Sequence, residues 1–181
     1  MAEVPESAAM KCTTSRRALF YATGLLAAVA FMPAAWALDA PTGKVVLTVS
    51  GMVQERNAPE GASFDMAMLE KLPQHSFSTK TPWYPQARKF TGVRLRDVLA
   101  AAGARGTVIN AVALNDYRVE IPGDDAARTD VMVAYLLDDK PMTVRERGPL
   151  FVIYPFDDSP DLRNAVYFSR AIWQLRTLDV K

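Results

Sequence analysis

Several polar and aromatic side chains stand at the ends of predicted strands, where they could bind a flat heterocyclic ring. Trp83 lies between two prolines, and Asn115, Asp116 and Tyr117 follow an apolar run rich in valine and alanine. An aromatic face can stack on such a ring, an amide or a carboxylate can pair with its edge, and an arginine can bind one of its oxygens. Binding groups concentrate on loops that a rigid scaffold holds in place, so the pattern predicts a ligand site at these strand ends.

The full set of candidate binding residues adds one threonine and two arginines to these four. Its members are Thr81, Trp83, Asn115, Asp116, Tyr117, Arg147 and Arg170. Ordinary structural roles remain open for the same residues. Asparagine and aspartate are common in turns because of their backbone geometry, and exposed arginines often form surface ion pairs.

The counts of histidine and cysteine exclude several kinds of chemistry. The chain of 181 residues contains one histidine, His75, and one cysteine, Cys12. One cysteine cannot form an intramolecular disulfide, and one histidine leaves no room for a multi-histidine metal site. No Gly-x-Ser-x-Gly turn accompanies His75, and no Gly-Lys-Ser/Thr phosphate loop is present. We therefore predict no metal site and no histidine-based catalytic triad, and the net charge of +1 argues against a nucleic-acid partner.

The first 37 residues resemble a signal peptide. Lys11, Arg16 and Arg17 form a positive start, and the following residues up to Ala37 are uncharged and mostly apolar. Ala35-Trp36-Ala37 is the small-x-small pattern that a signal peptidase cleaves. We expect cleavage after Ala37, export to the periplasm, and one domain over residues 38–181.

Two alternatives remain open for this segment. Ser15-Arg16-Arg17-Ala18-Leu19-Phe20 resembles a twin-arginine signal, which would export an already folded protein. A run of this length, with 17 apolar residues among the 20 from Ala18 to Ala37, could also span a bilayer as an uncleaved anchor. Pro33 and the Ala-x-Ala pattern favour cleavage.

Many short strands and a few short helices are predicted for residues 38–181. Leu95, Val98 and Leu99 share one helical face and Gly103 suits the helix end, so the spacing predicts a helix over Leu95–Ala102. Ser63 could cap an earlier helix, and Pro82-Trp83-Tyr84-Pro85 is predicted to be an extended loop. The fold class is α+β, with a mixed β-sheet core.

Seven short segments follow one another along the chain in an order typical of a known protein family. The segments are Phe90–Val93, Leu95–Leu99, Ala113–Tyr117, Ile121-Pro122, Arg147–Leu150, Tyr154-Pro155 and Trp173–Leu175. Together they resemble the small exported members of the sulfite-oxidase-type fold, the oxidoreductase molybdopterin-binding domain. The resemblance covers about Val45 to Val180. It implies a mixed α+β domain with a central β-sheet and a cleft for a pterin.

One departure from the family pattern decides which function the resemblance implies. Catalytic members hold molybdenum through a cysteine thiolate, but the corresponding stretch, Thr79 to Ala87, contains no cysteine. The resemblance then implies a non-catalytic periplasmic protein whose ligand is a pterin, either a reduced pterin or a molybdopterin-like one, without a metal. Its partner would be the periplasmic domain of an inner-membrane protein, such as a cyclic-di-GMP enzyme. The alternative is a molybdopterin-dependent oxidoreductase that lacks the usual cysteine ligand.

Overall fold

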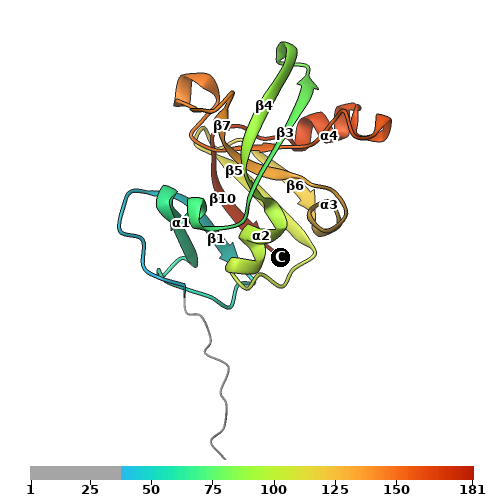
Figure 1. Ribbon diagram of the computed structural model, residues 1–181. Coiled ribbons are helices and arrows are strands. Elements are labelled where there is room, and N and C mark those ends of the chain that lie inside the picture. Colours follow the sequence, from blue (N-terminus) through green and yellow to red (C-terminus); the bar gives the residue numbers. More distant parts are fainter. Residues whose placement is uncertain (1–37) are drawn as a thin grey trace, which may run out of the picture. The chain divides into compact units, whose positions relative to one another are not determined.

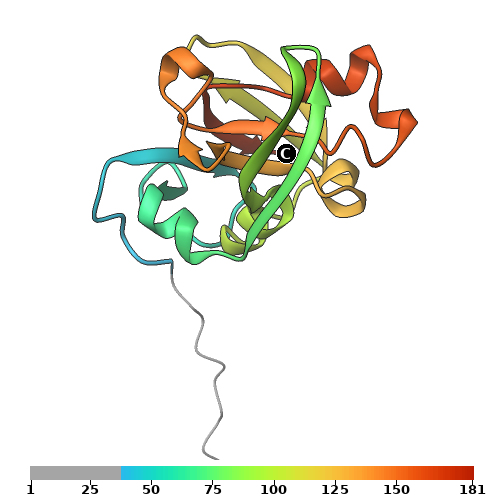
Figure 2. The same cartoon turned by 45° about the horizontal axis from the view of Figure 1, so that its top comes forward.

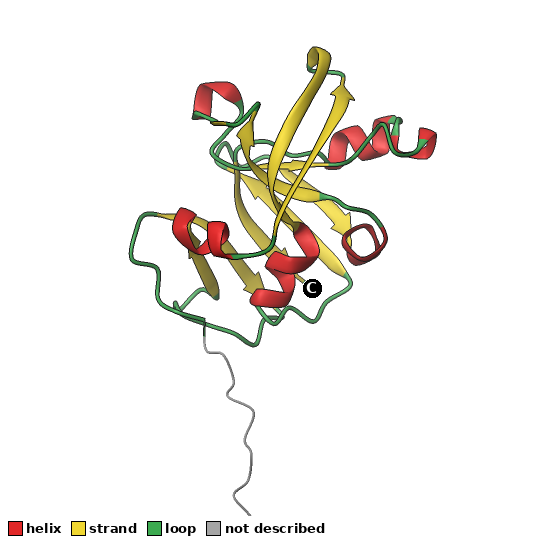
Figure 3. Cartoon of the chain, viewed as in Figure 1, coloured by secondary structure: helices red, strands yellow, loops and turns green. Residues whose placement is uncertain are grey.

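Strands supply most of the regular structure in residues 38–181, the part of the chain that the computed structural model describes (Figures 1 and 3). The predicted signal peptide, residues 1–37, lies outside the described residues. The strands are β1 (Val45–Gly51), β2 (Ala62–Asp65), β3 (Gln74–Thr81), β4 (Tyr84–Arg94), β5 (Val108–Ala113), β6 (Arg118–Pro122), β7 (Met132–Leu137), β8 (Lys140–Pro141), β9 (Phe151–Ile153) and β10 (Leu175–Val180).

The helices are short, as the sequence predicts (Figure 3). They are α1 (Met66–Lys71), α2 (Leu95–Ala101), α3 (Gly123–Arg128) and α4 (Ala165–Arg170), with single 3-10 turns at Val144–Glu146 and Pro160–Leu162. Within residues 38–181, none of these helices is long and apolar enough to cross a membrane.

The first sheet has the strand order β2-β1-β10-β5-β6. The sequence of β1 alternates, so that Leu47 and Val49 point into the core while their neighbours are more exposed. β1 and β10 run parallel, and the other neighbouring strands of this sheet run antiparallel. The sheet is therefore mixed, as predicted.

The second sheet has the order β3-β4-β7-β8, with β9 also paired to β7. β3 and β4 form a long hairpin that extends from the rest of the domain (Figure 1) and crosses its front in the turned view (Figure 2). The predicted loop over Pro82-Trp83-Tyr84-Pro85 is only half right, because Tyr84 and Pro85 already belong to β4. β4 pairs with β7 only from Phe90 onward, so Pro85 does not interrupt that ladder.

Capping residues explain where α1 and α2 begin or end, and the N-cap of α1 differs from the prediction. α2 ends as expected, with Gly103 at a φ of 59° just after it. The cap of α1 is Asp65 rather than Ser63, because Ser63 pairs with Thr48 in the first sheet. Asp65 accepts hydrogen bonds from the backbone N–H groups of Met68 (2.8 Å), Gly43 (2.7 Å) and Thr42 (2.9 Å).

Buried side chains from both sheets form one hydrophobic core. The largest that are fully buried are Tyr154, Phe64, Phe90, Phe151, Phe156, Leu47, Leu69, Leu95, Ile109, Ile121, Met132 and Leu150. The two sheets meet where Phe151 of β9 pairs with Trp173, two residues before β10 begins. This junction brings aromatic residues from distant parts of the sequence together.

The close approach of β4 and β7 gives a test of the second sheet. A Cβ atom at Gly92 would lie 2.2 Å from the carbonyl oxygen of Val133, so the strands would have to separate. We expect Gly92→Ala to lower the free energy of unfolding by about 1–3 kcal/mol, as overpacking does. Gly43→Ala is the control, because its nearest neighbour is the Asp65 carboxylate at 3.3 Å. Equal stability of the two variants in urea unfolding would contradict the described strand packing.

The cap of α1 makes a prediction about pH. Backbone hydrogen bonds from Gly43 and Met68 hold the pKa of Asp65 below its ordinary value. A lowered pKa in the folded state stabilises the fold above the unfolded pKa of about 3.9, and this stabilisation is lost as the pH falls through the folded pKa. The gap in unfolding free energy between the wild type and Asp65→Asn should therefore narrow as the pH is lowered below about 4. A gap that stays constant across this titration contradicts the role of the Asp65 charge.

Candidate functional site

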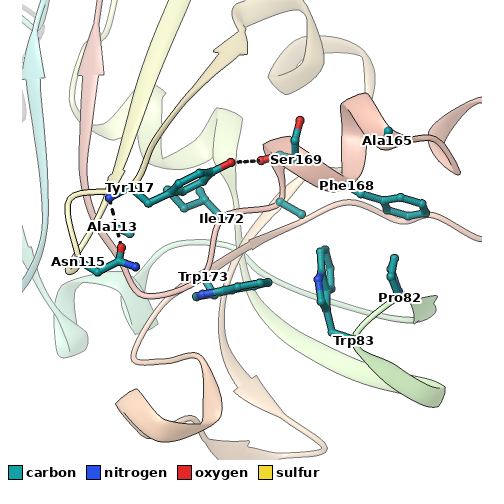
Figure 4. Close-up of a pocket in the computed structure, with 11 residues that line it drawn as sticks. Pro82, Trp83, Ala113, Asn115, Tyr117, Ala165, Phe168, Ser169, Ile172 and Trp173 are labelled. Carbon is teal, nitrogen blue, oxygen red and sulfur yellow. Dashed lines mark hydrogen bonds between the residues drawn. The ribbon is translucent and has the colours of Figure 1, made fainter.

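A cavity of about 540 Å³ opens at the junction of the two sheets (Figure 4). Its walls come from the β3–β4 turn, the β5–β6 turn, α4 and the segment that leads into β10. No charged side chain lies among the residues that line it. The lining residues are Pro82, Trp83, Ala113, Asn115, Tyr117, Ala165, Phe168, Ser169, Ala171, Ile172 and Trp173.

Trp83 forms one side of this cavity and is held by other aromatic rings. Its ring meets Trp173 at a centroid distance of 5.5 Å and an angle of 87°, and it meets Phe168 at 6.3 Å and 78°. Figure 4 shows Trp83 upright beside Trp173, which is seen nearly edge-on. Phe151 and Phe156 also pack against Trp83, at 5.7 and 6.3 Å. Edge-to-face contacts of this kind fix the orientation of a ring, so Trp83 is part of the scaffold as well as of the wall.

Asn115 and Tyr117 supply polar groups at the opposite side of the cavity. The side-chain oxygen of Asn115 accepts a hydrogen bond from the backbone N–H of Tyr117 (3.2 Å). The Tyr117 hydroxyl donates to the carbonyl oxygen of Ser169 (3.4 Å), which links the β5–β6 turn to α4 (Figure 4). Within residues 38–181 the side-chain nitrogen of Asn115 donates no hydrogen bond, so it can donate to a ligand.

The backbone around the cavity is strained at three residues. Asp116, Arg147 and Gln174 have φ values of 63°, 72° and 56°, in the left-handed region that favours glycine. Two backbone hydrogen bonds link their loops: the N–H of Gln174 donates to Arg147, and the N–H of Leu114 donates to Gln174, both at 2.9 Å. Strained backbone concentrates at functional sites, so this cluster marks the same end of the domain as the cavity does.

Arg147 contacts a cavity residue without lining the cavity itself. Its guanidinium lies over the ring of Trp173 at 5.4 Å and over the ring of Tyr84 at 4.9 Å. Its Nε atom is buried and has no hydrogen-bond partner among the described residues. These cation–π contacts connect Trp173 to the first residue of β4. Arg147 therefore supports Trp173 from outside the cavity, whereas the sequence suggested direct contact with the ligand.

Three other candidate binding residues also lie outside the lining. Asp116 is exposed and pairs with Arg176 at 3.0 Å, and Arg170 pairs with Asp125 at 2.9 Å. Thr81 is buried, and its hydroxyl oxygen accepts a hydrogen bond from the backbone N–H of Trp83 (3.3 Å). Thr81 thus shapes the turn that carries Trp83.

The structure therefore brings together only part of the predicted set. Trp83, Asn115 and Tyr117 line the cavity, and Trp173 joins them. Sequence reasoning did not single out the α4 residues Phe168 and Ser169, which form the wall between Trp83 and Tyr117. The sequence signal for a helix here was weak, because α4 is only six residues long and buries none of its residues completely.

Comparison with known proteins gives the family of this fold. The family model described as "Oxidoreductase molybdopterin binding domain" matches residues 35–156. The chain belongs to this family. The expected sulfite-oxidase-type fold is thereby confirmed, and the chain carries a molybdopterin-binding domain of the oxidoreductase type.

A solved structure supports the same fold at low sequence identity. The crystal structure of the sulfane dehydrogenase SoxCD from Paracoccus pantotrophus aligns with a TM-score of 0.56 and 18% identity. The alignment covers 74% of this chain but 37% of that protein chain, so the molybdopterin-binding domain described here spans well under half of the solved relative. No functionally curated protein matches the chain in sequence.

The residues present fit the pterin part of the family's cofactor better than its metal. Among residues 38–181, no group of three or more histidine, cysteine, aspartate or glutamate side chains could hold a metal ion. The single cysteine, Cys12, lies outside the described residues. A soft thiolate ligand for molybdenum therefore has no source within the described fold. Aromatic walls and one free amide do suit a flat ring with hydrogen-bonding edges.

His75, the only histidine, lies away from the cavity in the β3 strand. Its Nδ1 atom is 3.2 Å from the guanidinium of Arg94, and its Nε2 atom is 3.9 Å from Asp130. Asp130 is also bound by Arg96 at 2.8 Å. Among residues 38–181, the polar neighbours of the ring are thus one arginine and one carboxylate, which is not a convergent set of metal donors.

The different packing of Trp83 and Tyr117 predicts different effects on stability. Trp83→Ala removes a ring that touches four others, and we expect a loss of about 2–4 kcal/mol in the free energy of unfolding. Tyr117 is 49% exposed and makes one long hydrogen bond, so Tyr117→Ala should cost less than about 1 kcal/mol. Urea unfolding followed by circular dichroism measures both. A larger loss for Tyr117→Ala than for Trp83→Ala would contradict the described aromatic packing.

Proposed function

We propose that this chain is an exported, non-catalytic protein that binds a pterin and signals to the periplasmic domain of an inner-membrane protein. The observation that carries the binding function is the uncharged, aromatic cavity with Asn115 at its edge. A pterin is flat and presents N–H donors and ring acceptors along one edge, which suits stacking walls and a free amide. Membership of the molybdopterin-binding family supports a pterin-type ligand.

The cavity favours a pterin without a phosphate group. A phosphate carries negative charge and is bound in proteins by arginine, lysine or clustered backbone N–H groups. The lining of the cavity contains no arginine or lysine, and the nearby Arg147 has its guanidinium between the rings of Tyr84 and Trp173. The proposed ligand is therefore an uncharged pterin, reduced or oxidised, rather than the phosphate-bearing metal cofactor.

The sequence supports export and signalling, whereas the cavity supports ligand binding. The positive start, the apolar run and the Ala-x-Ala pattern within residues 1–37 support export to the periplasm. The resemblance to exported members of the fold supports a membrane partner, and a cyclic-di-GMP enzyme is the proposed kind. A tagged wild-type chain should copurify with such a protein from the membrane fraction in a pterin-dependent manner.

Family membership also favours a second function, an oxidoreductase that uses a molybdopterin cofactor. Metal analysis of the protein purified from its native periplasm separates the two functions. One molybdenum per chain would establish the cofactor and overturn the proposal of a metal-free pterin-binding protein. A metal-free preparation that binds a pterin saturably would support it.

The proposed ligand site predicts the effect of two neighbouring substitutions on binding. Asn115→Ala should weaken pterin binding by about tenfold, since a hydrogen bond to a neutral ligand contributes about 1 kcal/mol or somewhat more. Asp116→Asn is the matched control, because Asp116 points out to Arg176 and does not line the cavity. Isothermal titration calorimetry with oxidised pterin and with a tetrahydropterin measures both variants.

Three results of this titration would count against the proposed ligand. Absence of saturable heat with either pterin for the wild type would overturn it. Equal loss of affinity in Asn115→Ala and Asp116→Asn would place the ligand outside the cavity. If Asn115→Ala binds pterin with the wild-type affinity, the Asn115 amide does not bind the ligand.

A further inference from the structure

The α4 helix forms one wall of the cavity but has few buried contacts of its own. Ala165, Phe168 and Ser169 of this helix line the cavity. None of its six residues is completely buried, and only Tyr167, Phe168 and Arg170 are partly buried. Segments with little buried apolar surface open and shift more readily than the core does. The position of this wall therefore depends on a small number of anchoring contacts.

One of these anchors is an ion pair to a buried carboxylate. Arg170, the last residue of α4, donates a hydrogen bond from its guanidinium to Oδ2 of Asp125 in α3 (2.9 Å). The hydroxyl of Tyr154, the residue that follows β9, donates to the same oxygen (2.8 Å). Asp125 is 8% exposed and Tyr154 is fully buried. Three distant parts of the chain thus meet at one carboxylate oxygen.

The chemistry of this cluster fixes the direction of each hydrogen bond. Burial and the neighbouring Asp125 charge raise the pKa of Tyr154, so its hydroxyl keeps its proton and acts as the donor. Arg170 is the only cation that pairs with Asp125 among the described residues. A buried carboxylate is costly unless it is paired and hydrogen-bonded, so Asp125 holds Arg170 strongly in place.

Apart from the long hydrogen bond that Ser169 accepts from Tyr117 (3.4 Å), the other contacts of α4 are aromatic and less specific in position. Tyr167 packs edge-to-face on Tyr154 at 5.4 Å, and Phe168 packs on Phe156 at 4.9 Å. Aromatic pairs tolerate a range of offsets, whereas a charge-assisted hydrogen bond requires a defined distance and angle. The ion pair is therefore the contact that defines where α4 stands.

We propose that Asp125 is a positioning residue for the ligand site: it holds Arg170 and thereby keeps Phe168 and Ser169 of α4 in place as a wall of the cavity. Neither Asp125 nor Arg170 touches the ligand in this arrangement. The inference rests on the proposed function only for the identity of the ligand as a pterin. It assigns to Arg170 a role different from the direct contact that the sequence suggested.

The test compares four variants with two probes. Oxidised pterin reports the proposed ligand site, and the neutral fluorescent probe N-phenyl-1-naphthylamine reports the apolar cavity whatever its natural ligand is. Asp125→Asn and Arg170→Met should each weaken the binding of both probes by about fivefold to tenfold. The double variant should lose no more than the larger single loss, because both changes remove the same ion pair. Arg170→Lys keeps the charge and should recover most of the affinity.

A matched control separates this role from a general loss of stability. Arg96 forms an ion pair with Asp130 at 2.8 Å, on a part of the chain that does not line the cavity. Arg96→Met should leave the affinity for both probes unchanged even where it lowers the melting temperature. All titrations are made at least about 15 °C below the melting temperature of the least stable variant, so that every variant is folded. Each 1 kcal/mol lost in unfolding free energy lowers the melting temperature of a domain of this size by only a few degrees.

The results of these titrations test the positioning role of Asp125 and the proposed pterin ligand separately. Unchanged affinity in Arg170→Met, which removes a partly exposed side chain, would overturn the positioning role even if Asp125→Asn fails to fold. Additive losses in the double variant, or no recovery in Arg170→Lys, would also overturn it. A wild type that binds the naphthylamine but not pterin would overturn the proposed function, and the positioning role would then be decided by the naphthylamine alone. A wild type that binds neither probe overturns both.

Discussion

The contact between Trp83 and Trp173 is the interaction on which the cavity depends. Trp83 comes from the β3–β4 turn, and Trp173 pairs with Phe151 of β9 just before β10 begins. The contact thus joins the hairpin to the junction of the two sheets. Large aromatic rings bury much apolar area and prefer fixed edge-to-face geometry. The rings therefore stabilise the domain and at the same time leave a flat-walled space beside them, which explains why a scaffold cluster can also form a binding wall.

Features that depend on neighbouring residues, such as helices and turns, could be predicted from the sequence. α2 follows from Leu95, Val98 and Gly103, which stand within one helix and its end. Asn115 and Tyr117 were found because a turn after an apolar strand places them at a strand end. The arginines were not predictable in the same way. Arg170 pairs with a residue 45 positions away and Arg176 pairs with Asp116 across 60 positions, so only the fold shows which charges are already neutralised.

Charge is arranged around the cavity rather than inside it. The ion pairs Asp116–Arg176 and Asp125–Arg170 are formed by residues that do not line the cavity. The guanidinium of Arg147 lies over two aromatic rings. Each charge thus has its own protein contacts, and the lining stays neutral. The family fold is kept while the donor set that would hold molybdenum is not present in residues 38–181. The chemistry of a site therefore has to be argued from its own residues, since a shared fold supports several functions.

The walls of the cavity differ in how firmly they are held. Trp173 is fixed by strand pairing, by Trp83 and by Arg147, whereas α4 is held by one ion pair, three aromatic contacts and one long hydrogen bond. A ligand can change the shape of a protein only by binding one arrangement better than another. Contacts to a rigid wall contribute affinity without changing the shape, while ligand contacts to Phe168 and Ser169 would favour the position of α4 described here. Because Tyr117 donates a hydrogen bond to Ser169, the β5–β6 turn is coupled to the same helix. A pterin between these walls would therefore stabilise both α4 and the β5–β6 turn in the positions described here.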